Sequence, residues 1–545
     1  MNNQALAELL FPHVTRTPED VEAIFPPRNL PEGAKVTRLA PSPTGFMHFG
    51  TLFPALVNER LATQSGGVFY LRIEDTDAKR EVAGAEQNLI DTLAYYQVYF
   101  NEGATADGAR GAYGPYRQSE RVDIYHVFAK KLVAEGKAYP CFCTAEDLDE
   151  IRAAQEAEKL TPGYYGKWAR HREMPFDEVK AALTAGKPFV LRIRADGDPA
   201  RKVKCNDLIK GNLDVPENEE DFVLLKSNGV PTYHFAHAVD DHLMQTTHVV
   251  RGEEWLASLP KHLQLFRYLG FRTPKYMHIS QLMKLDGNSK VKLSKRDKGA
   301  ALSDYRVQGY PPVSVLEYVM TLLNSNFEEW RRANPTLPYT DFPFSIKKMS
   351  PSGSLFDLDK LNDVSKNAIS RMTAEDVYAS VLDWAREYDA DFAALLAADP
   401  VKATRILAIG RGGKKPRKDF ATWTDVKPYM ALFYKELFER IDSIPDTYDA
   451  ATVQTVLRAF LASYDSADDS TAWFEKLKDI AESVGYARET KLYKENPEAF
   501  KGHVGDVSMF VRIAVTGKQN SPDLYEIMQI LGKDEVCARV TAALA

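Results

Sequence analysis

The sequence predicts a multidomain protein in which an α/β region is followed by an all-α region. Between about residues 36 and 310, short apolar runs alternate with helical patterns, and the run at 68–73 ends in acidic residues, as a buried parallel strand does. From residue 373 to 545 the pattern is helical, with apolar residues three and four apart, as at Val453, Val456 and Phe460. The length of 545 residues is enough for roughly three to five domains.

The composition is that of a soluble globular protein, with 44% hydrophobic and 27% charged residues. The net charge of −7 does not favour nucleic-acid binding, but it does not exclude it. A large RNA-binding enzyme needs a basic surface on one face and not a positive net charge. We find no apolar run of bilayer-spanning length and no signal-peptide pattern, so we expect no membrane association. Four cysteines indicate a reducing cytoplasm rather than a disulfide framework.

The stretch at residues 38–51 follows a strand that is predicted to begin near Val36. Two prolines and a glycine break regular structure there, and a helical run follows. Thr51 is expected to cap this helix, so the backbone N–H groups of Gly50 and Thr51 would face an anion, most often a phosphate. His48 adds a side-chain donor at the same place. The alternative is an ordinary turn.

A second stretch, Lys-Leu-Ser-Lys-Arg at 292–296, lies in a predicted polar loop at 284–299, and alone it indicates only a solvated loop. Together with His-Phe-Gly-Thr at 48–51, about 240 residues earlier, it resembles the two signature motifs of class I aminoacyl-tRNA synthetases. Four segments between them resemble bacterial-type glutamyl-tRNA synthetases: Ile-Glu-Asp-Thr-Asp (73–77), Gly-Pro-Tyr-Arg-Gln-Ser (114–119), Pro-Thr-Tyr-His (231–234) and Arg-Gly-Glu-Glu-Trp (251–255). The resemblance is close over residues 36–310 and looser over the remainder.

The resemblance implies a Rossmann-type nucleotide-binding catalytic domain with an inserted α/β domain, followed by an all-α anticodon-binding region. The expected divisions are an N-terminal extension (1–35), the first catalytic half (36–137), the inserted acceptor-end-binding domain (138–220), the second catalytic half with the Lys-Leu-Ser-Lys-Arg loop (221–310), a stem-contact connecting domain (311–372) and the helical anticodon-binding domain (373–545). The extension departs from the family pattern, and we expect it to pack against the catalytic domain.

The implied activity is the ATP-dependent conversion of L-glutamate to glutamyl-adenylate, followed by transfer to the 3′ end of tRNA-Glu with release of AMP and pyrophosphate. This chemistry needs no protein nucleophile, because it rests on positioning and on stabilising charge. Mg²⁺ would accompany ATP. The residues implied in catalysis and ATP binding are His48, Gly50, Thr51, Lys292, Ser294 and Lys295. We expect a cytoplasmic enzyme that acts as a monomer.

Glutamate carries two carboxylates, so its recognition calls for more than one cation. Arg38 and Arg251, each at the end of a predicted strand, are the candidates, and which one holds the side-chain carboxylate stays open. The resemblance implies that five further residues line the pocket: Ala40, Ser42, Glu74, Tyr233 and His237. Glu74 would face the ammonium group. His237 stands where the family usually has Asn, but a neutral His can still donate one hydrogen bond.

Some family members bind zinc in the inserted domain through a Cys-x-Cys pair and later Tyr, Cys or His ligands. Cys141 and Cys143 form such a pair, but Trp168 and Arg170 stand where the later ligands are expected, and neither can bind zinc. We therefore expect no metal, with His171 as a stray candidate ligand.

One basic cluster interrupts the helical C-terminal region: Arg411, Lys414, Lys415, Arg417 and Lys418. Phe420 and Trp423 follow closely, and basic residues beside aromatic ones suit the unstacked bases of an RNA loop. The cluster is the candidate tRNA-binding surface, and the alternative is a solvated basic loop.

Four other functions are weighed. A non-discriminating enzyme would also charge tRNA-Gln, which the sequence does not decide. A glutaminyl enzyme tends to carry Glu and Asn where this chain has Ala-Pro-Ser-Pro-Thr-Gly. A catalytically inactive RNA-binding relative is disfavoured by the intact His48, Lys292 and Lys295, and a short tRNA-modifying paralogue would lack the helical C-terminal half.

Overall fold

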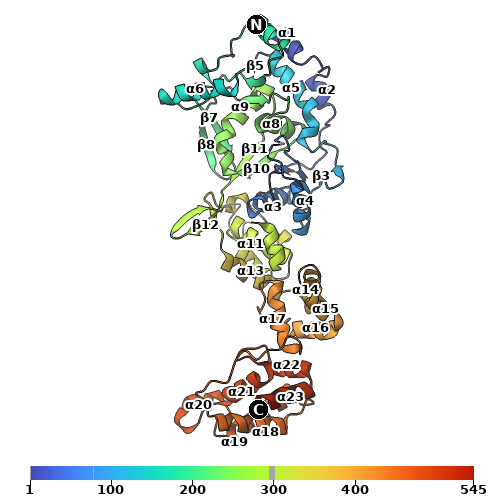
Figure 1. Cartoon of the computed structure of the whole chain (residues 1–545), viewed down its shortest axis with the longest axis vertical. Coiled ribbons are helices and arrows are strands. Elements are labelled where there is room, and N and C mark those ends of the chain that lie inside the picture. Colours follow the sequence, from blue (N-terminus) through green and yellow to red (C-terminus); the bar gives the residue numbers. More distant parts are fainter. Residues whose placement is uncertain (1, 78, 294–300, 545) are drawn as a thin grey trace. The chain divides into compact units, whose positions relative to one another are not determined.

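The computed structural model describes residues 2–77, 79–293 and 301–544 (Figure 1). The chain forms two compact units: residues 1–304 with 319–357, and residues 305–318 with 358–545. Within the described ranges, no helix is both long enough and apolar enough to cross a membrane. Each unit has its own core, as expected for a multidomain chain.

A parallel sheet organises the first unit. Strands β1 (Val36–Leu39), β2 (Val68–Leu71) and β3 (Glu102–Thr105) run parallel, and β4 (Gly108–Arg110) returns antiparallel to β3. Strands β10 (His248–Gly252) and β11 (Lys275–Ile279) are also parallel, and the Thr247 N–H donates to the Val36 carbonyl at 3.0 Å beside β1. β1 therefore lies between β2 and β10, so the order of the strands reverses there, although β10 and β11 hydrogen-bond as a two-stranded sheet of their own. Ligands of α/β sheets bind at such a switch point.

The sheet carries helices that confirm the predicted alternation. Helix α3 (Phe49–Gln64) contacts β1, β2 and β10. The other helices of this region are α4 (Ala85–Tyr95), α5 (Val122–Ala134), α8 (Tyr233–Leu243) and α9 (Leu259–Leu269), which follows the 3₁₀ turn η3 (Glu253–Ser258). Gly67 directly precedes β2. A Cβ at this position would lie 2.0 Å from the Lys35 carbonyl oxygen, so only glycine lets the segments at Lys35 and Gly67 approach this closely.

The inserted segment has its own small sheet, with antiparallel strands β5 (Ala138–Cys141), β6 (Val190–Ile193) and β9 (Val223–Leu225). The sheet reaches β9, beyond the boundary predicted at residue 220. Helices α6 (Ala145–Ala157) and α7 (Phe176–Thr184) accompany it. Strands β7 (Lys202–Asp207) and β8 (Gly211–Pro216) form a separate ribbon against β11, where the Leu208 N–H donates to the Tyr276 carbonyl at 3.0 Å (Figure 1).

The N-terminal extension packs on this unit, as expected. Its helices are α1 (Asn3–Leu10), which lies on α5, and α2 (Pro18–Glu22). Arg28 donates from both terminal nitrogens to the Glu102 carboxylate, at 2.8 and 2.9 Å, and lies over the Tyr113 ring. Gln245, just after α8, donates to the Pro26 carbonyl at 2.7 Å and accepts from the Arg28 N–H at 2.9 Å.

The region after β11 differs from the predicted loop at 284–299. Strands β12 (Leu282–Asp286) and β13 (Ser289–Lys292) form a hairpin whose turn contains Gly287 at φ +59°, and β14 (Ser354–Leu355) pairs with β12. The alternating pattern of this segment was hidden by its charges. Helices α10 (Leu302–Gln308), α11 (Pro312–Leu323) and α12 (Phe327–Ala333) follow.

The second unit is helical, which confirms the predicted all-α region. Its helices share one apolar core, which includes Val456, Phe510 and Val540. They are α13 (Leu358–Ser370), α14 (Ala374–Tyr388), α15 (Ala390–Ala398), α16 (Pro400–Ala408), α17 (Val426–Met430), α18 (Ala450–Ser463), α19 (Ser470–Ser483), α20 (Thr490–Glu495), α21 (Val504–Thr516), α22 (Leu524–Leu531) and α23 (Lys533–Leu544). The remaining 3₁₀ turns of the chain are Gln118–Arg121, Gly166–Trp168, Tyr339–Asp341, Ile346–Lys348, Trp423–Asp425, Ala431–Phe433 and Pro497–Ala499.

Candidate active site

Arg38 and Arg251 lie on neighbouring strands at the switch point of the sheet. Arg38 is on β1 and Arg251 is on β10, and Nη1 of Arg38 approaches the Val250 carbonyl at 3.4 Å. Both side chains are buried. The predicted placement of two cations at strand ends is therefore confirmed, and their surroundings distinguish them.

Arg38 is neutralised by the protein itself. Its Nε lies 3.2 Å from Oδ1 and 3.3 Å from Oδ2 of Asp241, which also accepts from Nη1 of Arg72 at 2.8 Å. Arg72 donates from Nη2 to Glu74 at 3.0 Å. Burial alone would raise the pKa of Asp241, but the charges of Arg38 and Arg72 hold it well below its ordinary value. Arg38 and Arg72 thus share Asp241, and Arg72 also pairs with Glu74 and Asp240.

Arg251 has no such counter-charge. Its Nε donates to Nε2 of His278 at 3.0 Å, and its Nη1 donates to Nδ1 of His262 at 3.0 Å and to the Tyr233 hydroxyl at 3.3 Å. Among the described residues no carboxylate forms an ion pair with it, and Nη2 is buried without a hydrogen-bond partner. Leaving a buried cation in this state costs free energy that an anion would recover.

Neutral histidines surround the two arginines. Nδ1 of His237 lies 2.8 Å from Asp241, and burial lowers the pKa of His237 to about 4 although Asp241 opposes this. Because Arg251 donates to Nδ1 of His262, that ring carries its proton on Nε2 and donates to Nδ1 of His234 at 2.9 Å. Burial lowers the pKa of His234 to about 4 and that of His262 well below its ordinary value. The histidines that face the two arginines are thus polar but uncharged at neutral pH.

The turn after β1 places the other predicted pocket residues. Ala40 is half-buried, Ser42 is exposed, and the neighbouring Pro41 carbonyl accepts the Glu74 N–H at 2.9 Å. Glu74 is buried, and burial raises its pKa although Arg72 opposes this. Tyr233 begins α8 and stacks on the ring of His237.

The phosphate-binding turn differs in one detail from the prediction. The helix α3 begins at Phe49 with His48 as its N-cap residue, and the Thr51 N–H already donates to the His48 carbonyl at 2.8 Å. Thr51 as the N-cap is therefore wrong, because the helix starts three residues earlier. A Cβ on Gly50 would lie 2.8 Å from Cε1 of His48, so glycine is needed for the imidazole to lie over this turn.

The second signature motif is described only in part. Lys292 ends β13 and is exposed, whereas Ser294 and Lys295 lie outside the described residues. Ala301 forms an antiparallel bridge with His48. The chain that leaves the second motif therefore returns to the first, which brings two motifs far apart in the sequence to one place.

Comparison with known proteins identifies the family. A model described as "tRNA synthetases class I (E and Q), catalytic domain" matches residues 35–362, and one described as "Anticodon binding domain" matches 417–544. A glutamate–tRNA ligase of Acetivibrio thermocellus is 51% identical over 546 residues, which cover all of both chains. The chain belongs to the glutamate–tRNA ligase family of class I aminoacyl-tRNA synthetases.

Further members of the glutamate–tRNA ligase family agree. The ligase of Sorangium cellulosum is 50% identical, with 97% of this chain and 98% of that one covered. The crystal structure of a glutamate–tRNA ligase of Elizabethkingia meningosepticum, in complex with its amino acid, superposes with a TM-score of 0.74 at 28% identity, with 94% of this chain and 99% of that one covered. The chain is thus an aminoacyl-tRNA synthetase with a class I catalytic domain and a helical anticodon-binding region, as the sequence predicts.

Several residues of the site escaped the sequence analysis. Asp241 follows His237 by four residues, on the same face of α8, and this spacing is the one signal that could have found it. Arg72 and His278 sit beside apolar runs and carry no local signal, while His262 lies within α9. Their roles depend on contacts between residues that are far apart in the sequence.

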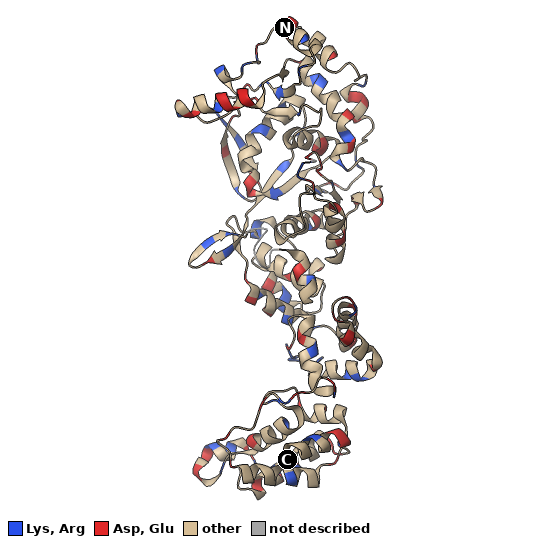
Figure 2. Cartoon of the chain, in the orientation of Figure 1, with Lys and Arg blue, Asp and Glu red and all other residues tan. Residues whose placement is uncertain are grey.

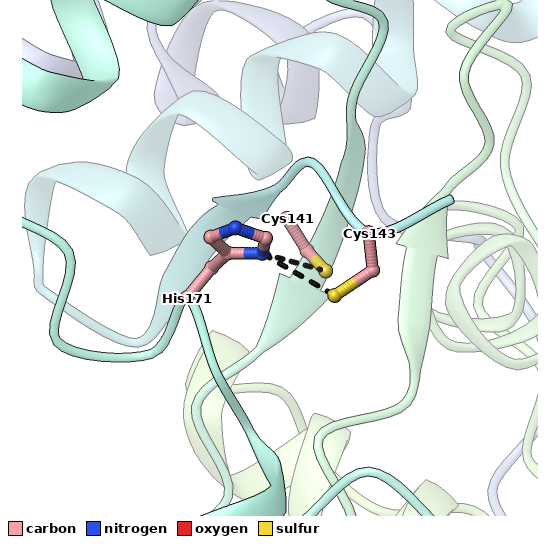
Figure 3. Close-up of side chains that lie close together, drawn as sticks. All are labelled: Cys141, Cys143 and His171. Atoms are coloured by element: carbon pink, nitrogen blue, oxygen red, sulfur yellow. Dashed lines mark hydrogen bonds between the residues drawn. The ribbon is translucent and has the colours of Figure 1, made fainter. Parts of the chain in front are cut away.

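In the inserted segment, Cys141, Cys143 and His171 form one cluster (Figure 3). Nδ1 of His171 lies 3.7 Å from Sγ of Cys141 and 3.4 Å from Sγ of Cys143, and the Tyr164 hydroxyl lies 3.3 and 3.5 Å from the same two sulfur atoms. The two sulfur atoms and the imidazole nitrogen lie within 4.8 Å of one another, so these three side chains could hold a metal ion such as zinc, with the Tyr164 hydroxyl beside them. The expectation that no metal binds stays a prediction; it rested on Trp168 and Arg170, and it treated His171 only as a stray candidate ligand.

The basic cluster of the second unit is only partly available to a ligand. Arg411 is half-buried, and its Nη1 donates to the Ile369 carbonyl at 2.6 Å, while Arg417 pairs with Asp419 at 2.7 Å. Exposed side chains without an ion pair to any described residue are Lys414, Lys415 and Lys418. The expected stacking role of Phe420 and Trp423 is wrong, because both rings are buried in the core. Figure 2 shows basic and acidic residues interspersed over the rest of this unit.

Proposed function

We propose that this chain activates L-glutamate with ATP and transfers it to the 3′ end of tRNA-Glu. The proposal is supported by Arg251, a buried cation that pairs with no carboxylate among the described residues and whose Nη2 has no hydrogen-bond partner there. It lies on β10 beside β1, at the position in the sheet where ligands bind. A substrate with a carboxylate would complete its hydrogen bonding.

The same geometry separates glutamate from glutamine. The two differ in a carboxylate against an amide of nearly the same volume, so charge rather than shape must select. An amide would present N–H₂ to a guanidinium and leave both groups unsatisfied. Arg251 would select glutamate over glutamine more strongly than Arg38, because Asp241 already neutralises Arg38. Arg38 would serve as a donor within the pocket, together with Tyr233 and His237.

In the proposed reaction, an α-carboxylate oxygen of glutamate attacks the α-phosphorus of ATP, and pyrophosphate leaves. The ribose hydroxyl at the tRNA 3′ end then attacks the adenylate carbonyl carbon, and AMP leaves. His48 and the first-turn amide of Gly50 would donate to phosphate oxygens, and Lys292 and Lys295 would neutralise the leaving pyrophosphate. Mg²⁺ would enter with ATP, largely bound by its phosphates.

The proposed partner of the second unit is the tRNA anticodon region. The exposed Lys414, Lys415 and Lys418 support this, because lysines free of ion pairs can neutralise RNA phosphates. Arg411 and Arg417 would then stabilise the loop that carries these lysines. We also propose a monomer in the cytoplasm, a compartment that suits four free cysteines.

The test is pyrophosphate exchange and charging with purified tRNA-Glu and tRNA-Gln, each with glutamate and with glutamine. Exchange with glutamate and charging of tRNA-Glu are expected. Lys295→Ala should lower kcat of adenylate formation by ~10²–10³ and leave ATP binding nearly intact, as for a lost transition-state donor. Charging of glutamine in preference to glutamate would refute the proposal, whereas charging of tRNA-Gln with glutamate would indicate a non-discriminating enzyme.

A further inference from the structure

The turn between β7 and β8 reaches the candidate active site from the inserted segment. Asp207, at the end of β7, is buried and accepts four hydrogen bonds. Oδ1 accepts from the N–H groups of Ile209 at 2.9 Å and Lys210 at 2.8 Å. Oδ2 accepts from the N–H of His278 at 3.0 Å and from its Nδ1 at 2.7 Å. Both oxygens of this carboxylate are therefore fully used.

These contacts determine the protonation of His278. Because a carboxylate only accepts, Nδ1 of His278 must carry a proton. Burial lowers the pKa of His278 although Asp207 opposes this, so the ring is neutral and its Nε2 is bare. Nε2 then accepts the Nε–H of Arg251 at 3.0 Å. One carboxylate thus fixes, through one imidazole, the orientation of a guanidinium on another strand.

A second contact holds the turn in place. Nζ of Lys210 donates to Glu253 at 2.5 Å, to Oγ of Ser280 at 2.8 Å and to the Pro351 carbonyl at 2.6 Å. Glu253 and Ser280 follow the ends of β10 and β11 directly, so the turn is attached to both strands. Asp207 is therefore not free to shift relative to Arg251.

We propose that Asp207 and His278 are positioning residues that direct Nη2 of Arg251, which is buried and has no hydrogen-bond partner among the described residues, toward the substrate carboxylate. The inference rests on the proposed function, in which Arg251 binds that carboxylate. If His278 carried its proton on Nε2, two N–H groups would face each other across 3.0 Å and Arg251 would turn away. Glutamate binding thus depends on a residue of the ribbon that never touches glutamate.

The first test is Asp207→Asn in the full-length protein. Asn has one acceptor oxygen where four donors converge, so it disfavours the Nδ1–H form of His278. The KM for glutamate should rise by up to about 100-fold, the scale for a displaced binding group, with a much smaller change in the KM for ATP. Asp214→Asn, on the exposed face of the same ribbon, is the matched control and should behave as the wild type. Equal effects on both KM values would overturn the proposal.

A double variant tests whether Asp207 acts through His278. If it does, Asp207→Asn combined with His278→Ala should bind glutamate no more weakly than His278→Ala alone. Losses that simply add would show that the two residues act independently, which would overturn the proposal.

The wild-type protein offers a measurement that needs no activity. Nitrogen-15 NMR of labelled histidine should show His278 at pH 7 as the neutral Nδ1–H tautomer, with the assignment taken from its loss in His278→Gln. An Nε2–H tautomer or an imidazolium would overturn the inference even if Asp207→Asn did not fold. Conversely, a wild type that activates no glutamate would refute the proposed function without changing the tautomer result.

Discussion

Nε of Arg38 lies 3.2 Å from Oδ1 of Asp241, and this buried ion pair joins β1 to α8 across 203 residues of sequence. Through this ion pair Arg38 contributes to the stability of the fold, whereas Arg251 pairs with no carboxylate among the described residues. Removing a buried partner leaves its counter-charge in a low-dielectric interior, whereas removing Arg251 leaves neutral acceptors only. The two arginines should therefore respond differently to the same substitution.

Arg251→Ala should lower kcat/KM for glutamate by ~2–4 kcal/mol, the scale for a lost buried charge contact, and should change the weak activity on glutamine little. Arg38→Ala should in addition lower the free energy of unfolding, on the order of 3 kcal/mol, because Asp241 loses one of its two arginines. Pyrophosphate exchange with each amino acid and urea unfolding measure the two effects. An Arg251→Ala enzyme that still prefers glutamate as strongly as the wild type would show that the pocket is assigned wrongly.

The buried histidines should make the first unit sensitive to acid. His234 and His237 have pKa values of about 4 when folded, against about 6.5 when unfolded. Between these values the unfolded chain binds more protons, so the free energy of unfolding falls as pH drops from 6.5 to 4, by roughly 3 kcal/mol for each fully shifted group. Urea unfolding at pH 7 and pH 5 should show this loss.

His237→Asn should flatten the same pH dependence, since it removes one of the groups that must take up a proton. Its activity at pH 7 should stay close to that of the wild type, because Asn can also donate one hydrogen bond. An unchanged pH dependence in this variant would show that His237 is already charged in the folded protein.

The lysines of the basic cluster should carry the RNA contact. Changing Lys414, Lys415 and Lys418 together to Ala should weaken tRNA binding and reduce the slope of log K against log salt by about two to three. The corresponding triple change to Arg keeps the charges and serves as the control. Arg411→Ala should instead lower stability, because its guanidinium satisfies the Ile369 and Met372 carbonyls. A tRNA affinity unchanged by the triple Ala variant at every salt concentration would identify a solvated loop.

The cysteine cluster can be tested with a metal. Added Co²⁺, which reports on thiolate ligands through its absorption, should bind at about one per chain, and Zn²⁺ should displace it. Cys143→Ser should weaken the thiolate band, since it leaves only the Cys141 thiolate, and His171→Ala should weaken binding, whereas Cys537→Ser, in the second unit, should change neither. Elemental analysis of protein purified without chelator then tests the expectation that the isolated protein contains no zinc. A Co²⁺ titration without any thiolate band would show that the side chains of this cluster only form hydrogen bonds.

Local patterns predicted what depends on neighbours in the sequence. The strand ends that carry Arg38 and Arg251, the helix α18 and the helical second unit all follow from periodicity and breakers, and all are confirmed. The helix start at His48 rather than Thr51 was missed, because a His with extended backbone is an uncommon cap and Thr is a common one. The error is three residues, slightly more than the one or two residues by which assigned helix ends usually differ.

What the sequence could not predict depends on tertiary contacts. No sequence pattern shows that Asp241 neutralises Arg38. Nor does any pattern show that, of these two arginines, Arg251 is the one without a carboxylate partner among the described residues. Phe420 and Trp423 were expected at an RNA-binding surface, but both are buried. The sequence around an aromatic residue near lysines is the same whether its ring faces solvent or the core. Their burial is determined by helices elsewhere in the second unit.

The N-terminal extension affects how this chain can be divided. The family match begins at residue 35, and a shortened fragment designed at that point would leave Glu102 and the face of α5 without the residues that cover them. Gln245, two residues after α8, holds the backbone left-handed at φ +58°, and it would lose its hydrogen bonds with the backbone of Phe25, Pro26 and Arg28. Such a fragment would expose apolar surface and a carboxylate that has lost its arginine, so it should aggregate on expression. Residue 35 is where the match to the catalytic-domain model begins, and it is not a boundary of independent folding.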